Sequence, residues 1–476
     1  MVQKRRPADL ATEMLGAEFG DARLSRRLGK IFEAVQDAPD RSFPSLFDDG
    51  QLEGAYRFFN NDAVTPEAIL RPHVAATVAR MADEPVALVV HDTSTMSFDP
   101  EGARRGLGRV RSAGQAFFAH VSLALSGDGS RMPLGVVAFS HRVRKGEQKK
   151  KKKKKNVKTK DTHENEHARW GRQVTAVASL GVDRSRVVHV MDREADDFAL
   201  FAQLTGDRDR FVIRLAHNRL LAKNDDGFEK LAQAVTQMHS LAEREVPLTR
   251  RPAGSRSPQQ RRIHPAREGR LAKLAIGATT VVLRRPRPQP KSLPETLSVN
   301  VVRVWEIDAE KGETPVEWIL LTTEPIASAE QILQVVDWYR ARWVIEEFFK
   351  AIKTGCAYDT RQFETLEGLL NVLATFLPIA WTLLLMRTQV RLAPEAKAST
   401  VLPKAMLAVL RIFTRIKLPA QPTARDALLA VAALGGHQKN NGEPGWITLA
   451  RGYEKLRTLT QGAAVRDDGL VGCVGS

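Results

Sequence analysis

The spacing of hydrophobic positions changes along the chain, and each change predicts a different kind of element. Residues 8–70 carry apolar side chains three or four positions apart and are predicted to be mainly helical. Asp21 is placed to cap a basic amphipathic helix within this region. Taken alone, that helix is better explained as a solvated surface than as an element that enters a DNA groove.

From about residue 85, short apolar runs replace the helical spacing. The run "VALVVH" predicts a buried strand that ends at Asp92, and "VVHVM" predicts a second strand that ends at Asp192. The runs "AFFAHVSLALS" and "PLGVVAFS" flank the turn "GDGS" and predict an antiparallel hairpin. Helices are expected from about 164 to 180 and over "EADDFALFAQL", followed by the strand "RFVIRL". This order predicts an α/β fold with helices packed against a mixed sheet.

The second half of the chain predicts a β-rich insertion and then helices. Residues from about 217 to 325 are rich in Arg, Pro and Gln and contain β runs such as "SVNVVRVW". The helical pattern resumes at Ser328, continues through "YRARWVIEEFFK", and returns beyond residue 390. Three regions are therefore expected: helical residues 1–72, an α/β region 73–388 and helical residues 389–476.

One apolar stretch, Leu369–Met386, is nearly long enough to span a membrane. Polar or helix-breaking residues interrupt it, and no second span accompanies it, so a buried core helix is the favoured interpretation. The first ten residues, "MVQKRRPADL", lack the apolar core of a signal peptide. A cytoplasmic protein is expected.

Charge points to an anionic partner. The 476 residues carry a formal net charge of +17, and nucleic acid is the commonest partner for such a balance. A protein that is merely basic remains the alternative. The chain contains two cysteines, Cys356 and Cys473, which excludes a disulfide framework and a four-thiolate zinc site.

Three carboxylates are candidates for a metal site. Asp92 and Asp192 each follow a predicted strand, where aspartate is more often a turn or cap residue than a functional one. If the sheet brings the two together, their charges require protonation, a cation or a metal ion. Glu346 is the candidate third acid, and carboxylate oxygens select magnesium or manganese. Two such ions support phosphoryl transfer.

A rival metal motif lies at His163–His167, where "HENEH" has the H-E-x-x-H spacing of zinc proteases. It directly follows a hydrophilic stretch that contains the lysine run Lys149–Lys155, whereas a zinc-protease helix needs a buried apolar face and a third ligand. A solvent-exposed helix start is therefore favoured. The lysine run itself is expected to be a disordered or DNA-facing loop.

Several segments together resemble a known family. These are "EGAYRFF", "VVHDTSTMSF", "VMDREADDFALF", "RFVIRLAH", "GETPVEWILLTTEP" and "YRARWVIEEFFKAIKTG". They are similar to the cut-and-paste DDE transposases of bacterial insertion sequences, the IS-four family of Tn-five type. The spacing of Tyr339, Arg342, Glu346 and Lys353 fits the signature of that family. The similarity runs from about residue 15 to 390, and the lysine run departs from it.

The resemblance implies an RNase-H-like catalytic core with a β-rich insertion, an N-terminal domain that binds the transposon end and a C-terminal dimerisation region. It implies that Asp92, Asp192 and Glu346 bind two Mg²⁺ ions, with Mn²⁺ as a substitute. It also implies that Trp318 stacks on a flipped base while the DNA end forms a hairpin. The further DNA contacts that it implies are Tyr339, Arg342, Lys350, Lys353, Arg214, Arg27 and Arg57.

The expected function is that of a magnesium-dependent DNA transposase, an endonuclease and strand transferase that acts as a homodimer on double-stranded DNA. Its substrates are transposon-end inverted repeats and target DNA, and its expected location is the bacterial nucleoid. Two alternatives remain open: an RNase-H-like structure-specific nuclease that cuts without joining, and a catalytically dead DNA-binding regulator. The presence of all three acids argues against the regulator.

Overall fold

The computed structural model describes residues 10–102, 104–110, 113–144, 168–222, 229–248, 250, 266–309, 313–438 and 442–469. The predicted lysine run and the "HENEH" motif lie outside these residues. The chain forms two compact units. Unit 1 comprises Met1–Glu84, Asp92–Lys158 and Trp343–Ser476, and unit 2 comprises Pro85–His91 and Thr159–Arg342.

Unit 1 is mainly helical, as the spacing predicted for its N- and C-terminal parts. Its helices are α1 (Leu10–Met14), α2 (Ala22–Asp37), α3 (Phe43–Leu46), α4 (Asp49–Phe59), α5 (Pro66–Ala82), α11 (Val344–Lys350), α12 (Leu366–Leu392), α13 (Lys404–Phe413), α14 (Ala424–Leu434) and α15 (Trp446–Gly469). Its strands are β2 (Gly108–Val110), β3 (Ala113–Ser126) and β4 (Pro133–Arg142). The β3–β4 hairpin is antiparallel, which confirms that prediction. Asp21 caps α2 by accepting from the backbone N–H of Arg23, as predicted.

Unit 2 is built on a sheet. Its strands are β5 (Val187–Met191), β6 (Arg210–Arg214), β7 (Ala242–Leu248), β8 (Arg270–Arg284), β9 (Thr296–Ile307) and β10 (Glu317–Thr322), and its helices are α6 (Ala168–Ala178), α7 (Phe198–Gly206), α8 (Leu231–Thr236) and α10 (Ala329–Ala341). The strand β1 (Ala87–Phe98) contributes its first residues here and its remainder to unit 1. The mixed α/β fold and the β-rich insertion are therefore confirmed.

Strand pairing in unit 2 changes from parallel to antiparallel along the sheet. The strand order is β1-β5-β6-β10-β9-β8-β7, and β5 pairs in parallel with both β1 and β6. All five residues of β5 are buried, as expected for a central parallel strand that is covered on both faces. From β6 onward each pairing is antiparallel, and β7, the edge strand, alternates partly buried with exposed residues. In unit 1 the strands β2, β3 and β1 are successive neighbours, and β4 pairs with β3.

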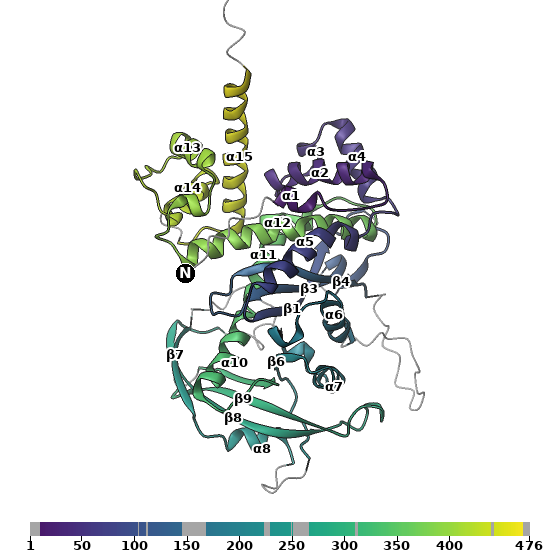
Figure 1. The fold of residues 1–476 in the computed structure, drawn as a ribbon, viewed down its shortest axis with the longest axis vertical. Coiled ribbons are helices and arrows are strands. Elements are labelled where there is room, and N and C mark those ends of the chain that lie inside the picture. The colour runs from purple at the N-terminus through teal and green to yellow at the C-terminus, as the bar shows by residue number, and fades with distance from the viewer. Residues whose placement is uncertain are drawn as a thin grey trace, which may run out of the picture. The chain divides into compact units, whose positions relative to one another are not determined.

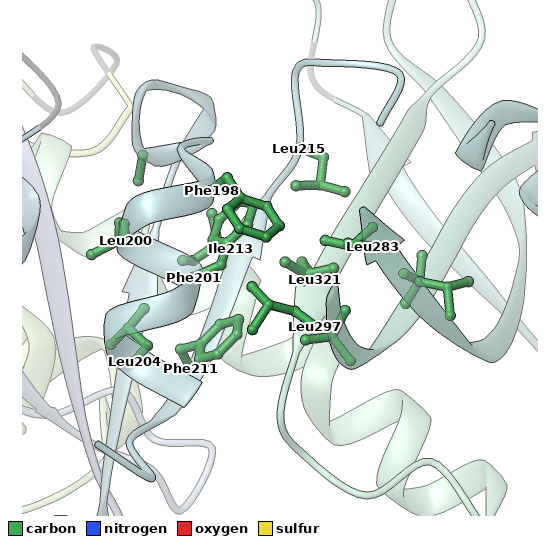
Figure 2. Close-up of a cluster of buried hydrophobic side chains, with 14 of the residues drawn as sticks. Phe198, Leu200, Phe201, Leu204, Phe211, Ile213, Leu215, Leu283, Leu297 and Leu321 are labelled. Carbon is green, nitrogen blue, oxygen red and sulfur yellow. The ribbon is translucent and has the colours of Figure 1, made fainter. Parts of the chain in front are cut away.

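The core of unit 2 lies between α7 and this sheet. Figure 2 shows Phe198, Phe201 and Leu204 of α7 facing side chains on the strands. Those strand residues include Phe211 and Ile213 of β6, Leu321 of β10, Leu297 of β9 and Leu283 of β8. The insertion strands β8 and β9 thus share one core with the β6 strand that precedes them.

The long apolar helix predicted near residue 370 is α12, which crosses unit 1 beside α5 (Figure 1). It is long and apolar enough to span a membrane, but 94% of its most apolar 18-residue window is buried inside the protein. Its polar residues have partners there: the Asn371 amide donates to the carbonyls of Phe59 and Val64. The preference for a core helix is confirmed.

A buried polar cluster ties α1 to α5 and β4 within unit 1. Glu13 accepts from His73 Nδ1 at 2.5 Å and from Arg80 at 2.8 Å, and His73 Nε2 accepts from the backbone N–H of Val136. Burial opposes the ionisation of Glu13, but the bonds from His73 and Arg80 outweigh it and lower the pKa of this carboxyl. The ring of Trp381 on α12 lies against both His73 and Arg80.

We expect Glu13→Ala to lower the free energy of unfolding by about 3 kcal/mol, because the substitution leaves a buried arginine without its counter-charge. Glu18→Ala, which changes an exposed acid of the same region, serves as the matched control and should change stability little. Chemical denaturation of both variants measures the difference. Equal stabilities would contradict the structural role of the cluster.

Candidate active site

The loop after β5 carries the four acids of "DREADD", and each acid has different bonding partners. Asp192 directly follows β5 and accepts from the backbone N–H of Glu194 at 2.9 Å, so that it caps the short turn Arg193–Ala195. Glu194 pairs with Arg169 of α6. Asp197 caps α7 and accepts from the Gln289 amide at 3.0 Å. The neighbouring acids are therefore engaged in holding the loop.

Asp196 is the anchor of this loop. Its carboxylate is fully buried and accepts from the backbone N–H groups of Ala216 and His217, both at 2.7 Å, and from the Arg219 guanidinium. These bonds attach the loop after β5 to the segment after β6. A carboxylate with so many donors is fixed in position, so Asp196 holds the backbone beside Asp192.

Asp92 does not end its strand, and that part of the prediction was wrong. β1 continues to Phe98 because Met96 and Phe98 extend the buried pattern and the strand runs beside β3. The parallel pairing with β5 is recorded from Ala87↔Val187 to Val90↔Val190. Asp92 and Asp192 therefore each lie two positions beyond the last residue pair of the β1–β5 ladder. The Asp92 carboxylate accepts from the backbone N–H of Thr93 at 2.8 Å.

A buried histidine pair lies on these same strands in unit 2. His91 Nε2 and His189 Nδ1 are 2.9 Å apart, and both rings are buried and stacked. Burial lowers the pKa of His189 to about 4, because a charged imidazole is costly in a low-dielectric core. The His189 ring is therefore neutral near pH 7, and the 2.9 Å distance requires one of the two rings to donate an N–H to the other.

The predicted continuous helix over Tyr339–Lys350 is interrupted. α10 ends at Ala341 and α11 begins at Val344. The N–H of Arg342 bonds to the Tyr339 carbonyl and that of Glu346 to the Trp343 carbonyl, so the chain tightens to three-residue spacing across the break. A π-turn, Ala351–Gly355, follows α11. Such turns frequently mark functional sites.

The two glutamates of α11 have different environments. Glu347 accepts from Lys350 at 2.6 Å and from Trp446 Nε1 at 3.2 Å, and lies 3.4 Å from Arg387. Burial alone raises the pKa of Glu347, but these partners outweigh it and lower the pKa overall. Glu347 therefore connects α11 to α12 and α15. Glu346 is partly buried on the same helix and has interactions of its own.

Lys353 lies in the π-turn beside a second acid, Asp359. The left-handed backbone of Ala357, with φ of 46°, reverses the chain so that the turn Tyr358–Thr360 contacts Ala351–Gly355. Burial lowers the pKa of Lys353 and raises the pKa of Asp359 to about 6, and each charge partly offsets the other. Burial makes this lysine less strongly hydrated than a surface lysine.

Three predicted DNA contacts of unit 2 lie close together. The rings of Trp318 on β10 and Tyr339 on α10 meet edge to face with centroids 5.4 Å apart. Arg214 of β6 pairs opposite Leu320 and donates to the Glu317 carbonyl at 3.1 Å. The sheet register and α10 thus assemble residues that are up to 125 positions apart in the chain (214 to 339). Tyr339 is 6% exposed, so its ring mainly supports that of Trp318.

The remaining predicted contacts are distributed over both units. Arg342 caps the C-terminus of α10 in unit 2 and is partly buried. Lys350 is half exposed and pairs with Glu347 in unit 1. On α4, Arg57 is 78% exposed and pairs with Glu53, and Arg27 on α2 lies against Gly54. Exposed ion pairs contribute little free energy, so these bases remain available to phosphates.

Sequence reasoning missed Trp343. It is 57% exposed at the start of α11, three residues before Glu346. A tryptophan within a helical pattern is usually buried, so the sequence did not indicate that this side chain is exposed. Its exposed ring is able to stack on a nucleobase.

Comparison with known families decides the identity. Residues 8–64 match the transposase DNA-binding family, and residues 128–377 match the transposase DDE domain family. The second match covers 250 of the 476 residues, more than half of the chain. The chain belongs to the DDE transposases. The matched range of the transposase includes Asp192 and Glu346, while Asp92 precedes it. DDE domains have an RNase-H-like core and use divalent metal ions to cleave DNA and transfer its strands.

The carboxylates of Asp92, Asp192 and Glu346 suit such ions, because carboxylate oxygens are the ligands that hard divalent cations prefer. Over the described ranges, however, no group of three or more His, Cys, Asp or Glu side chains is arranged to hold a metal. Asp92 and Glu346 belong to unit 1 and Asp192 to unit 2. Their joint role therefore stays a prediction.

We expect the transposase to lose stability as the pH falls from about 6.5 to 4. The unfolded chain protonates His189 near its ordinary pKa, whereas the folded state does so at about 4, so stability is present above this window and lost on acidification. The contribution is roughly 3 kcal/mol. His189→Gln should flatten the pH dependence of the unfolding midpoint, and the exposed control His239→Gln should leave it unchanged. Parallel pH profiles for all three proteins would contradict the burial argument.

Proposed function

We propose that this transposase moves a DNA element by cut-and-paste transposition, as the IS-four family of Tn-five type does. The supporting observation is the DDE domain match over residues 128–377, a range that includes Asp192 and Glu346. The matching DNA-binding family over residues 8–64 supports a role for the N-terminal helices in recognising the transposon end.

The proposed catalytic residues are Asp92, Asp192 and Glu346, which hold two Mg²⁺ ions, with Mn²⁺ as a substitute. When bound, such ions activate a water or a 3′-hydroxyl and stabilise the leaving oxygen in phosphoryl transfer. Asp196 positions the backbone that carries Asp192 through its bonds to the segment after β6. Glu347 positions α11 through Lys350 and Arg387.

The cationic and aromatic residues of this proposal hold the DNA end. Arg214 and Trp318 lie together in unit 2, and the Tyr339 ring supports that of Trp318. We propose that Trp318 stacks on an extruded base while the end closes into a hairpin, since an aromatic face compensates for lost base stacking. Arg342, Lys350 and Lys353 contact phosphates, and Trp343 adds an exposed aromatic surface beside Glu346.

The proposed organisation keeps three regions: an end-binding region 1–72, a catalytic region 73–388 with its insertion, and a C-terminal region 389–476 for dimerisation. A homodimer bridging two DNA ends and a location at the bacterial nucleoid belong to the same proposal. The boundaries at 72 and 388 fall inside α5 and α12, so continuous helices join the regions.

Adjacent glutamates provide a sharp test of catalysis. Glu346→Gln should reduce cleavage at the element's ends by roughly a thousandfold, since several kcal/mol of metal-dependent stabilisation are lost. End binding and melting temperature should persist. Glu347→Gln removes two ion pairs and should lower the melting temperature while cleavage continues. A plasmid carrying the DNA that flanks the gene, incubated with Mg²⁺ and analysed on denaturing gels, measures cleavage. Normal cutting by Glu346→Gln would overturn the assignment.

The aromatic pair provides a test of the hairpin step. Trp318→Ala should leave the first strand cut intact and reduce hairpin formation, while Trp318→Phe should restore most of it because a ring face remains. Hairpin and nicked ends are separated on denaturing gels. Equal hairpin yields from Trp318→Ala and wild type would exclude base stacking by this residue.

A further inference from the structure

The segment that ends α13 in unit 1 exposes three large apolar side chains. Ile412 is 74% exposed, and Phe413 and Ile416 are exposed close to it in the chain. Over the ranges that the structure describes, no other five-residue stretch exposes three large apolar side chains. An exposed apolar cluster on a folded protein commonly marks a binding surface, because its contact with water is unfavourable. We call Ile412, Phe413 and Ile416 the apolar tip.

The apolar tip stands on a packed base. α13 contacts α14 and α15 (Figure 1), and Val409 and Leu410 of α13 are buried in the core that these helices share. Beyond the helix, the Arg411 guanidinium donates to the Ala420 carbonyl at 2.6 Å, which ties the following loop back to α13. The tip is therefore presented from a fixed position, and a preformed surface loses less conformational entropy when it binds a partner.

The charges next to the apolar tip in the chain have a single sign. Residues 404–420 contain Lys404, Arg411, Arg415 and Lys417 and no Asp or Glu. Arg415 and Lys417 are exposed, and neither forms an ion pair with any residue that the structure describes. A surface of this charge repels a second copy of itself in a symmetric contact and attracts a polyanion.

Cationic and apolar groups together suit duplex DNA. Lysine and arginine contact phosphates, while exposed Phe, Leu or Ile side chains wedge between base steps from the minor groove and kink the duplex. Amide and carboxylate side chains, which read base edges, do not occur between residues 404 and 420. This surface is therefore suited to DNA without a particular sequence. The proposed function needs such a surface, since target DNA lacks the repeat that marks the element's ends.

We propose that the apolar tip and its flanking cations, Arg415 and Lys417, bind and kink the target DNA of this transposase. The inference rests on the proposed cut-and-paste function, which requires a target duplex as well as the element's ends. In this arrangement the cations hold the backbone while Ile412 and Phe413 unstack a base step. The C-terminal region thereby contacts DNA in addition to its proposed role in dimerisation.

The test separates the apolar part of the surface from the cationic part. Ile412→Ser changes the tip and Lys417→Gln removes one flanking charge. The matched controls, Ile447→Ser and Lys455→Gln, change exposed residues of α15. The full chain is titrated against a labelled duplex that lacks the terminal repeat, at several salt concentrations. Energy transfer between dyes at the two duplex ends measures the bend, and melting temperatures check folding.

We expect Ile412→Ser to weaken binding by on the order of tenfold and to reduce the bend, because an apolar contact with the bases is lost. Its salt dependence should stay that of the wild type, since the tip releases no counterions. Lys417→Gln should instead lower the slope of log affinity against log salt by about one. Both controls should match the wild type. If Ile412→Ser unfolds, the exposed Lys417 still provides a test.

Three results would overturn the inference. One is equal binding and bending by Ile412→Ser and Ile447→Ser. Another is a change in oligomeric state, measured by light scattering, with DNA binding unaltered, which would assign the tip to a second copy of the chain. The third is loss of binding to anionic lipid vesicles alone. A wild-type protein that bends the duplex but joins no strand to it would overturn the proposed function instead, which distinguishes the two failures.

Discussion

Ion pairs formed by the neighbours of the proposed catalytic acids are the interactions on which this site depends. Glu347 is bound by Lys350 and lies close to Arg387, and Asp196 by Arg219 and two backbone N–H groups. Each neutralised acid fixes a backbone segment next to a proposed catalytic acid. In a protein with a net charge of +17, cations are plentiful, and their placement determines which carboxylates hold the backbone.

Much of the fold could be predicted from residue patterns, because those patterns reflect local physics. Periodicity and turn chemistry are enough to predict four features: the buried run of β5, the β3–β4 hairpin, the Asp21 cap and the apolar core helix α12. The end of β1 could not be predicted, since its continuation past Asp92 depends on pairing with β3, a contact between distant segments. The break after Ala341 was also missed, because Arg342 and Trp343 have ordinary helical propensity.

Parts of the candidate site could likewise be predicted and parts could not. Family resemblance named Arg214, Trp318 and Tyr339, but only the sheet register and the packing of α10 show that Tyr339 supports the Trp318 ring. The different environments of Glu346 and Glu347 depend on Arg387 and Trp446, which lie 40 and 99 residues beyond Glu347. No local pattern carries that information, because adjacent glutamates have the same intrinsic chemistry.

The chain passes between its two compact units after Glu84, His91, Lys158 and Arg342, and the first strand is divided between them. Neither unit is a continuous stretch of polypeptide, so no single truncation isolates either one. A ribosome must finish residue 342 before the sheet-bearing unit is complete, and must continue to the C-terminal helices before the other unit is complete. Premature stops in the gene would therefore yield fragments that misfold, not small independent binding modules.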